Sequence, residues 1–415
     1  MKPILPCALA SFLLLAATGC ALIDLRSQDQ RINRTGFIAI EVMPPLPSTA
    51  VYALAVASSG KVVGAERVGA DRFTTFALPN KEVFTVVVFA DANGNRRFDA
   101  GERAAVRQNL MPVPLGDPSQ KARLVPMPLG RFTAGMPAGL EVPDAPGAAV
   151  SLIAGDFASL NEAKFQPETG TKGMWEPEAA LMDGSTGLYL AEPFDPARTP
   201  VVFVHGIGGS PQDFKKLIPA LDRSRYQAWF FAYPSGFRLG KASTALATLL
   251  DLTMKRYGVS KVHIVAHSMG GLVSRDAILK ITALQDGRPV GRFVSISTPF
   301  GGHAAAKSGL RHLRYPVPSW IDMAPGSAFL VELWKQKLPC PHWLIFGYDT
   351  KPVPWLTLNN DTVVDLESTL YRPAQEEAVR VIGLKKDHES ILTAHETAEK
   401  MNEFLGASSA QSGIF

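Results

Sequence analysis

The C-terminal half of the chain alternates short apolar runs with longer stretches that have helical spacing. The apolar runs predict strands at residues 201–205, 226–233, 262–266, 293–297, 343–347 and 379–383, and the stretches between them predict helices at 212–221, 242–257, 270–284 and 391–405. Alternating strands and helices indicate a mostly parallel sheet with helices on both faces. Residues 201–204 are apolar at successive positions, which is typical of a strand buried on both sides. We therefore expect an α/β domain over residues 198–406 and a flexible tail over 407–415.

The N-terminal half has a different pattern, with short alternating runs separated by Pro, Gly and Asn clusters. The runs at 37–42, 51–57, 73–78 and 83–89 predict strands, so we expect a small antiparallel β-sandwich domain over residues 35–129. Residues 130–197 are rich in Pro, Gly and Ala with weak periodicity, which indicates a linker and an irregular lead-in segment. Two domains also agree with a length of 415 residues, more than one hydrophobic core usually serves.

The first residues form a separate segment. The apolar run Leu9 to Ala17 is too short to span a bilayer and is typical of a signal peptide, here residues 1–19. Two small residues precede Cys20, and this pattern resembles the lipobox of bacterial lipoproteins. The resemblance implies that Cys20 is lipidated, that residues 20–34 form a tether, and, with Ala21 following, that the protein is sorted to the outer membrane. An ordinary secretory signal is the alternative.

Composition and charge narrow the possible partners. The chain is 46% hydrophobic and 19% charged, which excludes wholesale disorder. Its net charge is +4 with scattered Lys and Arg residues, so we expect no nucleic-acid partner. If Cys7 leaves with the signal and Cys20 is acylated, only Cys340 remains, and we interpret it as a structural thiol without a disulfide.

Candidate chemistry begins where the predicted strand 262–266 leads directly into a turn and a helix. Ser268 lies in that turn, and Gly270 supplies the small residue that a nucleophile elbow needs two positions later. Ala266 stands where the G-x-S-x-G pattern has its first glycine. Upstream, the strand 201–205 ends in His205-Gly206-Ile207-Gly208-Gly209, a glycine-rich turn.

These two motifs, in this order, resemble those of bacterial lipases of the α/β-hydrolase superfamily. The resemblance implies an α/β-hydrolase fold, with Ser268 as the nucleophile and the backbone N–H groups of Ile207 and Met269 as the oxyanion hole. The family carries its acid and then its histidine after later strands. Asn360-Asp361-Thr362 resembles the acid segment with Thr in place of Gly, so Asp361 is the expected acid, with Asp365 and Glu367 as rivals.

His388 is the expected base, because it follows the strand near Gly383 and opens a helical stretch. The other histidines have different interpretations. His205 and His267 belong to the two turns, His263 to a strand core and His395 to the last helix, and His303 is expected to line the site without acting as a base.

The expected function is hydrolysis of carboxylic esters, by an esterase or lipase, through a Ser268–His388–Asp361 triad and an acyl-enzyme. An ester or lipid is the expected substrate, the lipid anchor is the expected contact with a membrane, and the chemistry requires no cofactor. Two alternatives stay open, namely an acyltransferase that uses the same triad and a non-catalytic surface-binding module. The sequence does not identify protein partners.

Two further segments have two interpretations each. The apolar and aromatic residues between 303 and 342 predict a cap that binds acyl chains, or residues that simply bury against the sheet. The loop 91–102 matches the ligand spacing of an EF-hand-type calcium loop, although Arg96 replaces the usual glycine, and it also has the composition of an ordinary hairpin. Its candidate calcium ligands are Asp91, Asn93, Asn95, Asp99 and Glu102.

Overall fold

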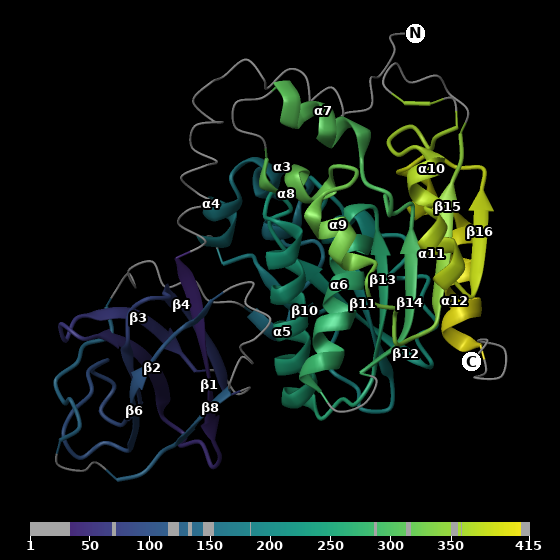
Figure 1. Ribbon diagram of the computed structural model, residues 1–415. Helices are drawn as coiled ribbons and strands as arrows, with labels where there is room; N and C mark the ends of the chain where they lie inside the picture. Colours follow the sequence, from purple (N-terminus) through teal and green to yellow (C-terminus); the bar gives the residue numbers. More distant parts are fainter. Residues whose placement is uncertain are drawn as a thin grey trace, which may run out of the picture.

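The structure is a computed structural model that describes residues 34–68, 72–114, 124–131, 135–143, 153–182, 184–285, 289–312, 317–349, 356–357 and 359–407. Cys20, with the leader and most of the tether, lies outside the described residues, and so does the tail from 408 to 415. Figure 1 shows a small β-rich unit, built by residues before 130, and a larger unit that carries the helices of the described chain.

The small unit consists of two four-stranded sheets. The first joins β1 (Thr35–Met43), β4 (Phe73–Pro79), β7 (Val113–Pro114) and β8 (Leu124–Pro128), and the second has the order β3-β2-β5-β6, with β2 (Ala50–Ala57), β3 (Val62–Arg67), β5 (Phe84–Asp91) and β6 (Ala104–Leu110). The pairs are antiparallel except that β8 runs parallel to β1. The predicted small sheet domain is therefore present, with one parallel pair that the alternation did not predict.

Both small sheets contribute to one core. Ile40 and Phe76 of the first sheet lie in the same buried cluster as Val86 and Val88 of the second. Val86 and Val88 are two residues apart, so they project from the same face of β5. The alternating pattern of the sequence thus buries one face of each sheet against the other.

The larger unit is built on one eight-stranded sheet with the order β16-β15-β14-β13-β11-β12-β10-β9. Its strands are β9 (Ile153–Phe157), β10 (Gly187–Leu190), β11 (Thr199–Val204), β12 (Tyr226–Ala232), β13 (Val262–His267), β14 (Val290–Ile296), β15 (His342–Gly347) and β16 (Arg380–Leu384). Neighbouring strands are parallel except for the antiparallel pair of β10 and β12. The predicted α/β-hydrolase fold, a mostly parallel sheet with helices on both faces, is confirmed.

The helices of the larger unit are α3 (Pro167–Trp175), α4 (Pro177–Met182), α5 (Leu239–Tyr257), α6 (Met269–Leu284), α7 (Ala304–His312), α8 (Pro318–Met323), α9 (Ala328–Leu333), α10 (Leu366–Thr369), α11 (Arg372–Glu377) and α12 (His395–Gly406). Short 3-10 helices occur at η2 (Ala163–Phe165), η3 (Pro211–Phe214) and η4 (Ser390–Thr393). In the range where a helix was predicted, 212–221, the structure has only the short 3-10 helix η3. Pro219 interrupts the stretch, because proline does not fit the interior of a helix.

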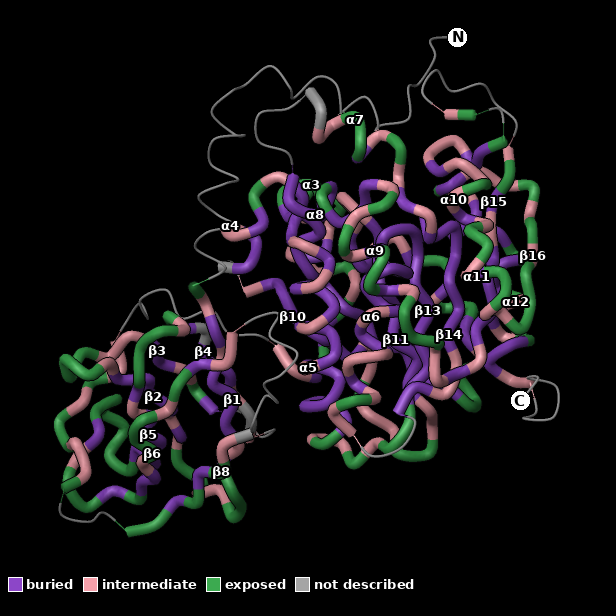
Figure 2. The backbone as a smooth tube through the Cα atoms, viewed as in Figure 1, coloured by how far each residue is buried: buried purple, intermediate pink, exposed green. Residues whose placement is uncertain are grey.

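Strand β11 explains why the apolar runs have no alternation. Val202 and Val204 pack in one core with residues of α5 and α6, while Val201 and Phe203 pack in a second core with residues of α12. Both faces of the strand are therefore buried, as Figure 2 shows for the centre of the sheet. A strand buried on both sides needs an apolar residue at every position.

The start of the larger unit differs from the predicted boundary at residue 198. The segment predicted as linker and lead-in contains β9 and β10, which form one edge of the sheet, together with α3 and α4. Both strands are short, with five and four residues, and the composition around them resembles that of a loop. The sheet therefore begins at Ile153.

Within the described residues, no helix has both the length and the apolar character needed to cross a membrane.

Candidate active site

The turn between β13 and α6 holds Ser268 in an uncommon backbone conformation. Ser268 has φ +53° and ψ −132°, between the end of β13 at His267 and the start of α6 at Met269. A non-glycine residue with positive φ is strained, and its surroundings must hold it in place. The N–H of Ser268 donates to the carbonyl of Ile296 on β14 (2.8 Å), which fixes the turn to the neighbouring strand. This arrangement has the strand, sharp turn and helix of a nucleophile elbow.

Small residues let the elbow touch the loop that follows β11. A side-chain carbon on Gly270 would collide with the backbone oxygen of His205, and one on Gly206 would lie 2.8 Å from Cβ of Ser268. Ala266 is buried in the main core, which accommodates its single methyl group at the position of the missing glycine. The two motifs found in the sequence are therefore in backbone contact.

The backbone N–H groups of Ile207 and Met269, which lie on either side of the Ser268 turn, have no acceptor within the described part of the chain. The N–H of Gly208, by contrast, donates to Oγ of Ser235 (2.8 Å). Met269 is the first residue of α6, where helix N–H groups lack intrahelical partners and carry partial positive charge. Both groups are available to an oxyanion.

His205 and Tyr233 hold the loop after β11 in place. The rings of these two residues stack with centroids 4.4 Å apart, and the Tyr233 hydroxyl donates to the carbonyl of His205 (2.9 Å). Nδ1 of His205 donates to the carbonyl of Gly206 (2.9 Å). Burial lowers the pKa of His205 to about 4, so this histidine stays neutral. His205 is thus a support of the loop, as its place in the turn predicts.

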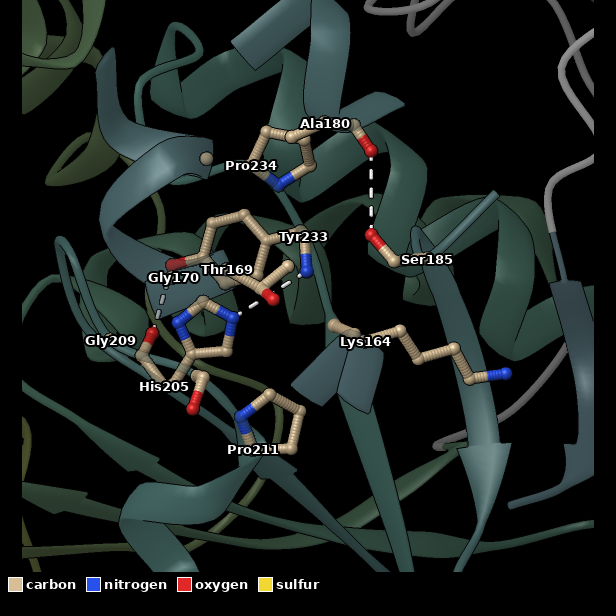
Figure 3. Close-up of a pocket in the computed structure, with 13 residues that line it drawn as sticks. Lys164, Thr169, Gly170, Ala180, Ser185, His205, Gly209, Pro211, Tyr233 and Pro234 are labelled. Atoms are coloured by element: carbon tan, nitrogen blue, oxygen red, sulfur yellow. Dashed lines mark hydrogen bonds between the residues drawn. The ribbon is translucent and has the colours of Figure 1, made fainter. Parts of the chain in front are cut away.

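Figure 3 shows a pocket next to this loop. Its lining includes His205, Gly209 and Tyr233, together with Lys164, Thr169 and Ser185 of the lead-in segment. Neither Ser268 nor His388 lines it. The pocket therefore borders the loop after β11 without including either candidate triad residue in its lining.

Asp361 lies in a tight turn after β15 and is almost fully buried, with 1% of its surface exposed. Its Oδ1 accepts hydrogen bonds from the N–H groups of Val363 (3.1 Å) and Val364 (2.7 Å). Thr362, which replaces the glycine of the family pattern, has φ +81°. The turn keeps a backbone conformation that favours glycine, although the residue there is threonine.

The rival carboxylates have other positions. Oδ1 of Asp365 accepts from the N–H and the hydroxyl of Thr357 (2.7 and 2.8 Å), and Asp365 precedes α10. Glu367 lies in the first turn of α10. The structure brings Asp361, and neither of these two, to His388.

His388 and Asp361 form a buried pair in which Nδ1 of His388 lies 2.7 Å from Oδ2 of Asp361. The backbone N–H of His388 also donates to the carbonyl of Asp361 (2.7 Å). Burial opposes the charge of the imidazolium, but the facing Asp361 carboxylate, together with the charges of Glu389 and Asp387, raises the pKa of His388 above its ordinary value. Burial likewise opposes the charge of the acid, yet its interaction with His388 keeps the pKa of Asp361 below its usual range.

Contacts of His267 place this pair beside Ser268. Nε2 of His267 lies 2.9 Å from the carbonyl oxygen of His388, and the two rings have centroids 4.6 Å apart. Because His267 directly precedes Ser268, the structure brings the three candidate triad residues to the same end of the sheet. The Ser268 hydroxyl forms no hydrogen bond within the described residues.

His303 supports the acid turn. Its Nε2 donates to the carbonyl of Val363 (2.9 Å), and its Nδ1 accepts from the N–H of Ala305 (3.2 Å). Burial lowers the pKa of His303. Both ring nitrogens are occupied, so His303 is held in one tautomer next to Asp361.

Asp213 is a residue that the sequence reasoning missed. It forms a capping box with Ser210 at η3, where its Oδ2 accepts from the N–H of Ser210 (3.3 Å). Burial raises the pKa of Asp213 to about 7, with the charge of Glu389 adding to the effect. The Ser-x-x-Asp spacing after the glycine-rich turn is the signal that predicts this cap.

The segment between 303 and 342 packs into the body of the domain. Its large apolar residues at 2–5% exposure belong to the main core, and they are Trp320, Met323, Leu330 and Leu333. Trp334 lies over the guanidinium of Arg275, with 4.2 Å between the cation and the ring centroid. The sequence left open whether this segment forms a cap that binds acyl chains or simply buries against the sheet, and these residues are buried. Val331, by contrast, is 57% exposed.

The loop 91–102 joins β5 to β6. Asp91 and Glu102 are buried, and their oxygens accept backbone N–H groups of the loop. Oδ2 of Asp99 accepts from the amide groups of Asn93 (3.0 Å) and Asn95 (2.6 Å). No group of three or more His, Cys, Asp or Glu side chains in the described residues has the arrangement of a metal site. The calcium site stays a prediction of the sequence.

Comparison with known proteins agrees with this architecture. Residues 201–400 match the model of a family described as the alpha/beta hydrolase family. No curated protein sequence matches the chain. Together with the fold, the family match supports the α/β-hydrolase superfamily for this part of the chain.

Solved structures with similar folds include lipases and an esterase. The mature form of the lipase BlEst2 from Bacillus licheniformis has 20% identity and a TM-score of 0.43, over 52% of this chain and 97% of that one. Lipase B from Aspergillus fumigatus has 16% identity and a TM-score of 0.40, over 55% and 58%. The carboxylesterase CesB (YbfK) from Bacillus subtilis has 12% identity and a TM-score of 0.36, over 52% and 86%. At these identities the similarity extends to the fold alone.

Proposed function

We propose that this protein is a serine hydrolase that cleaves carboxylic esters, with Ser268 as nucleophile, His388 as general base and Asp361 as the acid of a triad. The observation that carries the proposal is the buried 2.7 Å pair of His388 and Asp361, bonded through His267 to the strained turn of Ser268. An ionised acid opposite Nδ1 leaves Nε2 of His388 as the basic nitrogen. The family match supports a hydrolase at a coarser level.

In the proposed first step, Oγ of Ser268 attacks the ester carbonyl carbon while Nε2 of His388 takes the hydroxyl proton. The carbonyl oxygen becomes an oxyanion, which accepts hydrogen bonds from the N–H groups of Ile207 and Met269. Such donors each contribute roughly 3–4 kcal/mol to transition-state stabilisation. The bond to the alcohol oxygen then breaks, and the alkoxide takes the proton from His388.

In the second step, water attacks the acyl-enzyme carbonyl and gives its proton to His388. The Ser268 oxygen leaves and regains that proton, and the carboxylic acid is released. Asp361 keeps His388 in one tautomer and stabilises the imidazolium in both steps. Apart from the ester and water, the proposed steps use only side chains and backbone groups of this chain.

A fluorophosphonate probe tests the proposal, because it reacts covalently with an activated serine. We expect the wild-type protein to be labelled and Ser268→Ala to be unlabelled, with kcat for a p-nitrophenyl ester lower by on the order of 10⁶-fold. Ser274→Ala is the matched control, since Ser274 is buried in α6 and its hydroxyl has no partner among the described residues. Failure of the wild type to react would overturn the proposal and favour a non-catalytic binding module.

A competing alcohol separates hydrolysis from acyl transfer. With a p-nitrophenyl ester and added alcohol, a hydrolase releases mostly the free carboxylic acid, while an acyltransferase forms mostly the new ester. A series of esters of increasing acyl length then distinguishes an esterase from a lipase. Product analysis by mass spectrometry gives both answers.

A further inference from the structure

The buried side chain of His267 joins the nucleophile elbow to the loop that carries His388. Its Nε2 lies 2.9 Å from the carbonyl oxygen of His388. A carbonyl oxygen only accepts hydrogen bonds, so Nε2 of His267 carries the proton and donates it. We propose that His267 is a positioning residue, which holds the backbone of His388, and with it the imidazole, against the turn of Ser268. This inference rests on the proposed function, because it concerns the base of the same triad.

The order of the strands explains why such a bond is needed. His388 follows β16, whereas Ser268 follows β13, and the sheet places β15 and β14 between these strands. No ladder of backbone hydrogen bonds joins β16 to β13 directly. The loop after β16 must therefore reach back across two strands to bring its histidine to the serine.

The other hydrogen bonds of His388 tie it to the acid. Its backbone N–H donates to the carbonyl of Asp361, and its Nδ1 donates to the carboxylate of the same residue, both at 2.7 Å. Asp361 follows β15, which is also separated from β13 by β14. The acid and base thus form one unit, and the bond from His267 fixes that unit to the elbow.

His267 is uncharged, which suits its proposed role as a hydrogen-bond donor to the backbone of His388. Burial, together with the neighbouring His388, lowers the pKa of His267 to about 3. His267 is therefore a neutral donor near pH 7. A cation in its place would oppose the positive charge that His388 acquires in the transition state.

The tautomer of His267 tests the inference in the wild-type protein without any substitution. In protein labelled with ¹⁵N at histidine, we expect His267 to be neutral between pH 6 and 8, roughly the range in which free histidine titrates, with its proton on Nε2. A His267 that carries its proton on Nδ1, or that becomes charged in this range, would overturn the inference, because Nε2 could not then act as described.

Substitutions test the consequence for catalysis. His267→Phe and His267→Leu fill the buried position with an apolar side chain and remove the donor, while His267→Gln retains an N–H donor. We expect kcat to fall on the order of 10²-fold in the first two variants, with KM little changed, because a displaced base slows the chemical step. Recovery of most of the activity in His267→Gln is expected. The low-field proton resonance of His388 Nδ1–H should broaden or shift in the variants without a donor.

His263→Phe is the matched control. His263 lies in the same strand and is buried like His267, but its ring faces Tyr226, with 5.8 Å between centroids, at the start of β12. We expect this variant to keep wild-type kcat and the wild-type resonance. Equal losses in His263→Phe and His267→Phe would indicate a merely structural role and would overturn the inference.

Failure of this inference differs from failure of the proposed function. If the wild type reacts with the fluorophosphonate and His267→Phe reacts at the same rate, the serine hydrolase remains and the positioning role is wrong. If the wild type does not react, the proposed function is wrong, and the role of His267 falls with it.

Discussion

The candidate base and acid have pKa values that depend on each other. The Asp361 carboxylate raises the pKa of His388 against the effect of burial, and His388 keeps the pKa of Asp361 low. A general base must be neutral to accept a proton. Activity should therefore decline as the pH falls through the raised pKa of His388, above the 6.5 of an ordinary histidine.

Asp361→Asn tests this coupling. Without the carboxylate, burial is the larger influence on the imidazole, so we expect the acidic limb of the kcat/KM profile to move to lower pH. We also expect kcat to fall by roughly 10⁴-fold, because asparagine does not fix the required tautomer. The measurement is hydrolysis of a p-nitrophenyl ester between pH 5 and 9. An acidic limb that stays in place or moves to higher pH would contradict the assignment of the pair.

The residue types and their local order in the sequence predicted much of this candidate site. The rest depends on contacts between segments that are far apart in the chain. The turns of Ser268 and His205 could be found because each motif is local in the sequence. Asp361 could be predicted only through the family resemblance. The turn after it has a φ of +81° at Thr362, a conformation that a glycine in the sequence would have indicated and a threonine does not. The bond from His267 to His388 joins residues 121 positions apart, and no local pattern encodes such a contact.

Among the elements, the central strands and the edge strand β16 were predicted from the sequence, whereas β9 and β10 at the opposite edge of the sheet were not. Residues 201–204 of β11 are apolar at every position, and all six residues of β13, with His263 and His267 among them, are buried, because both faces of these strands are covered. In contrast, β10 has four residues and β9 has five, and β9 contains Gly155 at φ +85°. These two strands depend on their neighbours in the sheet, so the local sequence pattern does not show their pairing.

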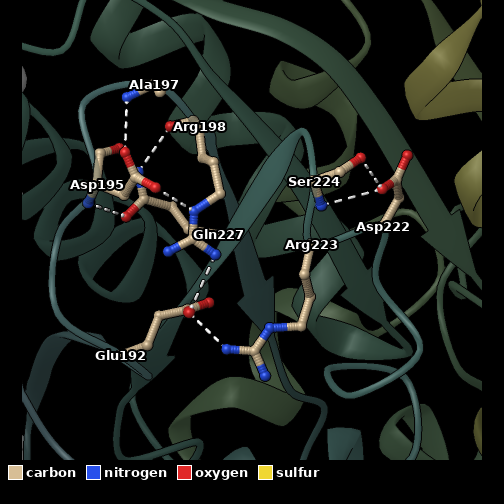
Figure 4. A network of polar contacts seen from close by, with 8 residues as sticks. All are labelled: Glu192, Asp195, Ala197, Arg198, Asp222, Arg223, Ser224 and Gln227. Atoms are coloured by element: carbon tan, nitrogen blue, oxygen red, sulfur yellow. Dashed lines mark hydrogen bonds and ion pairs between the residues drawn. The ribbon is translucent and has the colours of Figure 1, made fainter.

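A polar network at the start of β12 lies at the end of the sheet opposite Ser268. Figure 4 shows Gln227 beside Asp195 and Arg198, with Glu192 and Arg223 at its rim. Gln227 is fully buried, and its Nε2 donates to the carbonyls of Asp195 (2.7 Å) and Arg198 (2.6 Å). Its Oε1 accepts the N–H of Asp195 (3.1 Å). The side chain therefore ties the loop before β11 to β12.

Gln227→Leu should destabilise the protein by about 2–4 kcal/mol, because it leaves backbone groups of that loop without partners. Urea unfolding gives the free-energy difference. Arg223→Ala is the control at the rim, where the Arg223 side chain is 61% exposed and its ion pair should contribute less than about 1 kcal/mol. At temperatures where Gln227→Leu is folded, its esterase activity should equal that of the wild type. A loss of activity in the folded protein would contradict the separation of this network from the site.

At the scale of the whole molecule, we propose that the protein is anchored in the outer membrane through a lipid on Cys20. The proposal rests on the sequence pattern before Cys20. Cys20→Ser should remove the mass of the acyl groups from the mature protein and move its activity from the membrane fraction to the soluble fraction. If the unsubstituted protein itself fractionates as soluble and carries no acyl mass, the anchor is wrong and an ordinary secretory signal is favoured.

The antiparallel pair of β10 and β12 has a consequence for anyone who expresses the catalytic unit in isolation. A fragment that starts at residue 198 contains the whole region matched by the family, residues 201–400, but it lacks the partner of β12 along residues 229–232. The bare amide and carbonyl groups of that strand would then pair with a second molecule, and precipitation would be the outcome. A fragment that starts before Ile153 retains β9 and β10 at this edge of the sheet and should remain in solution.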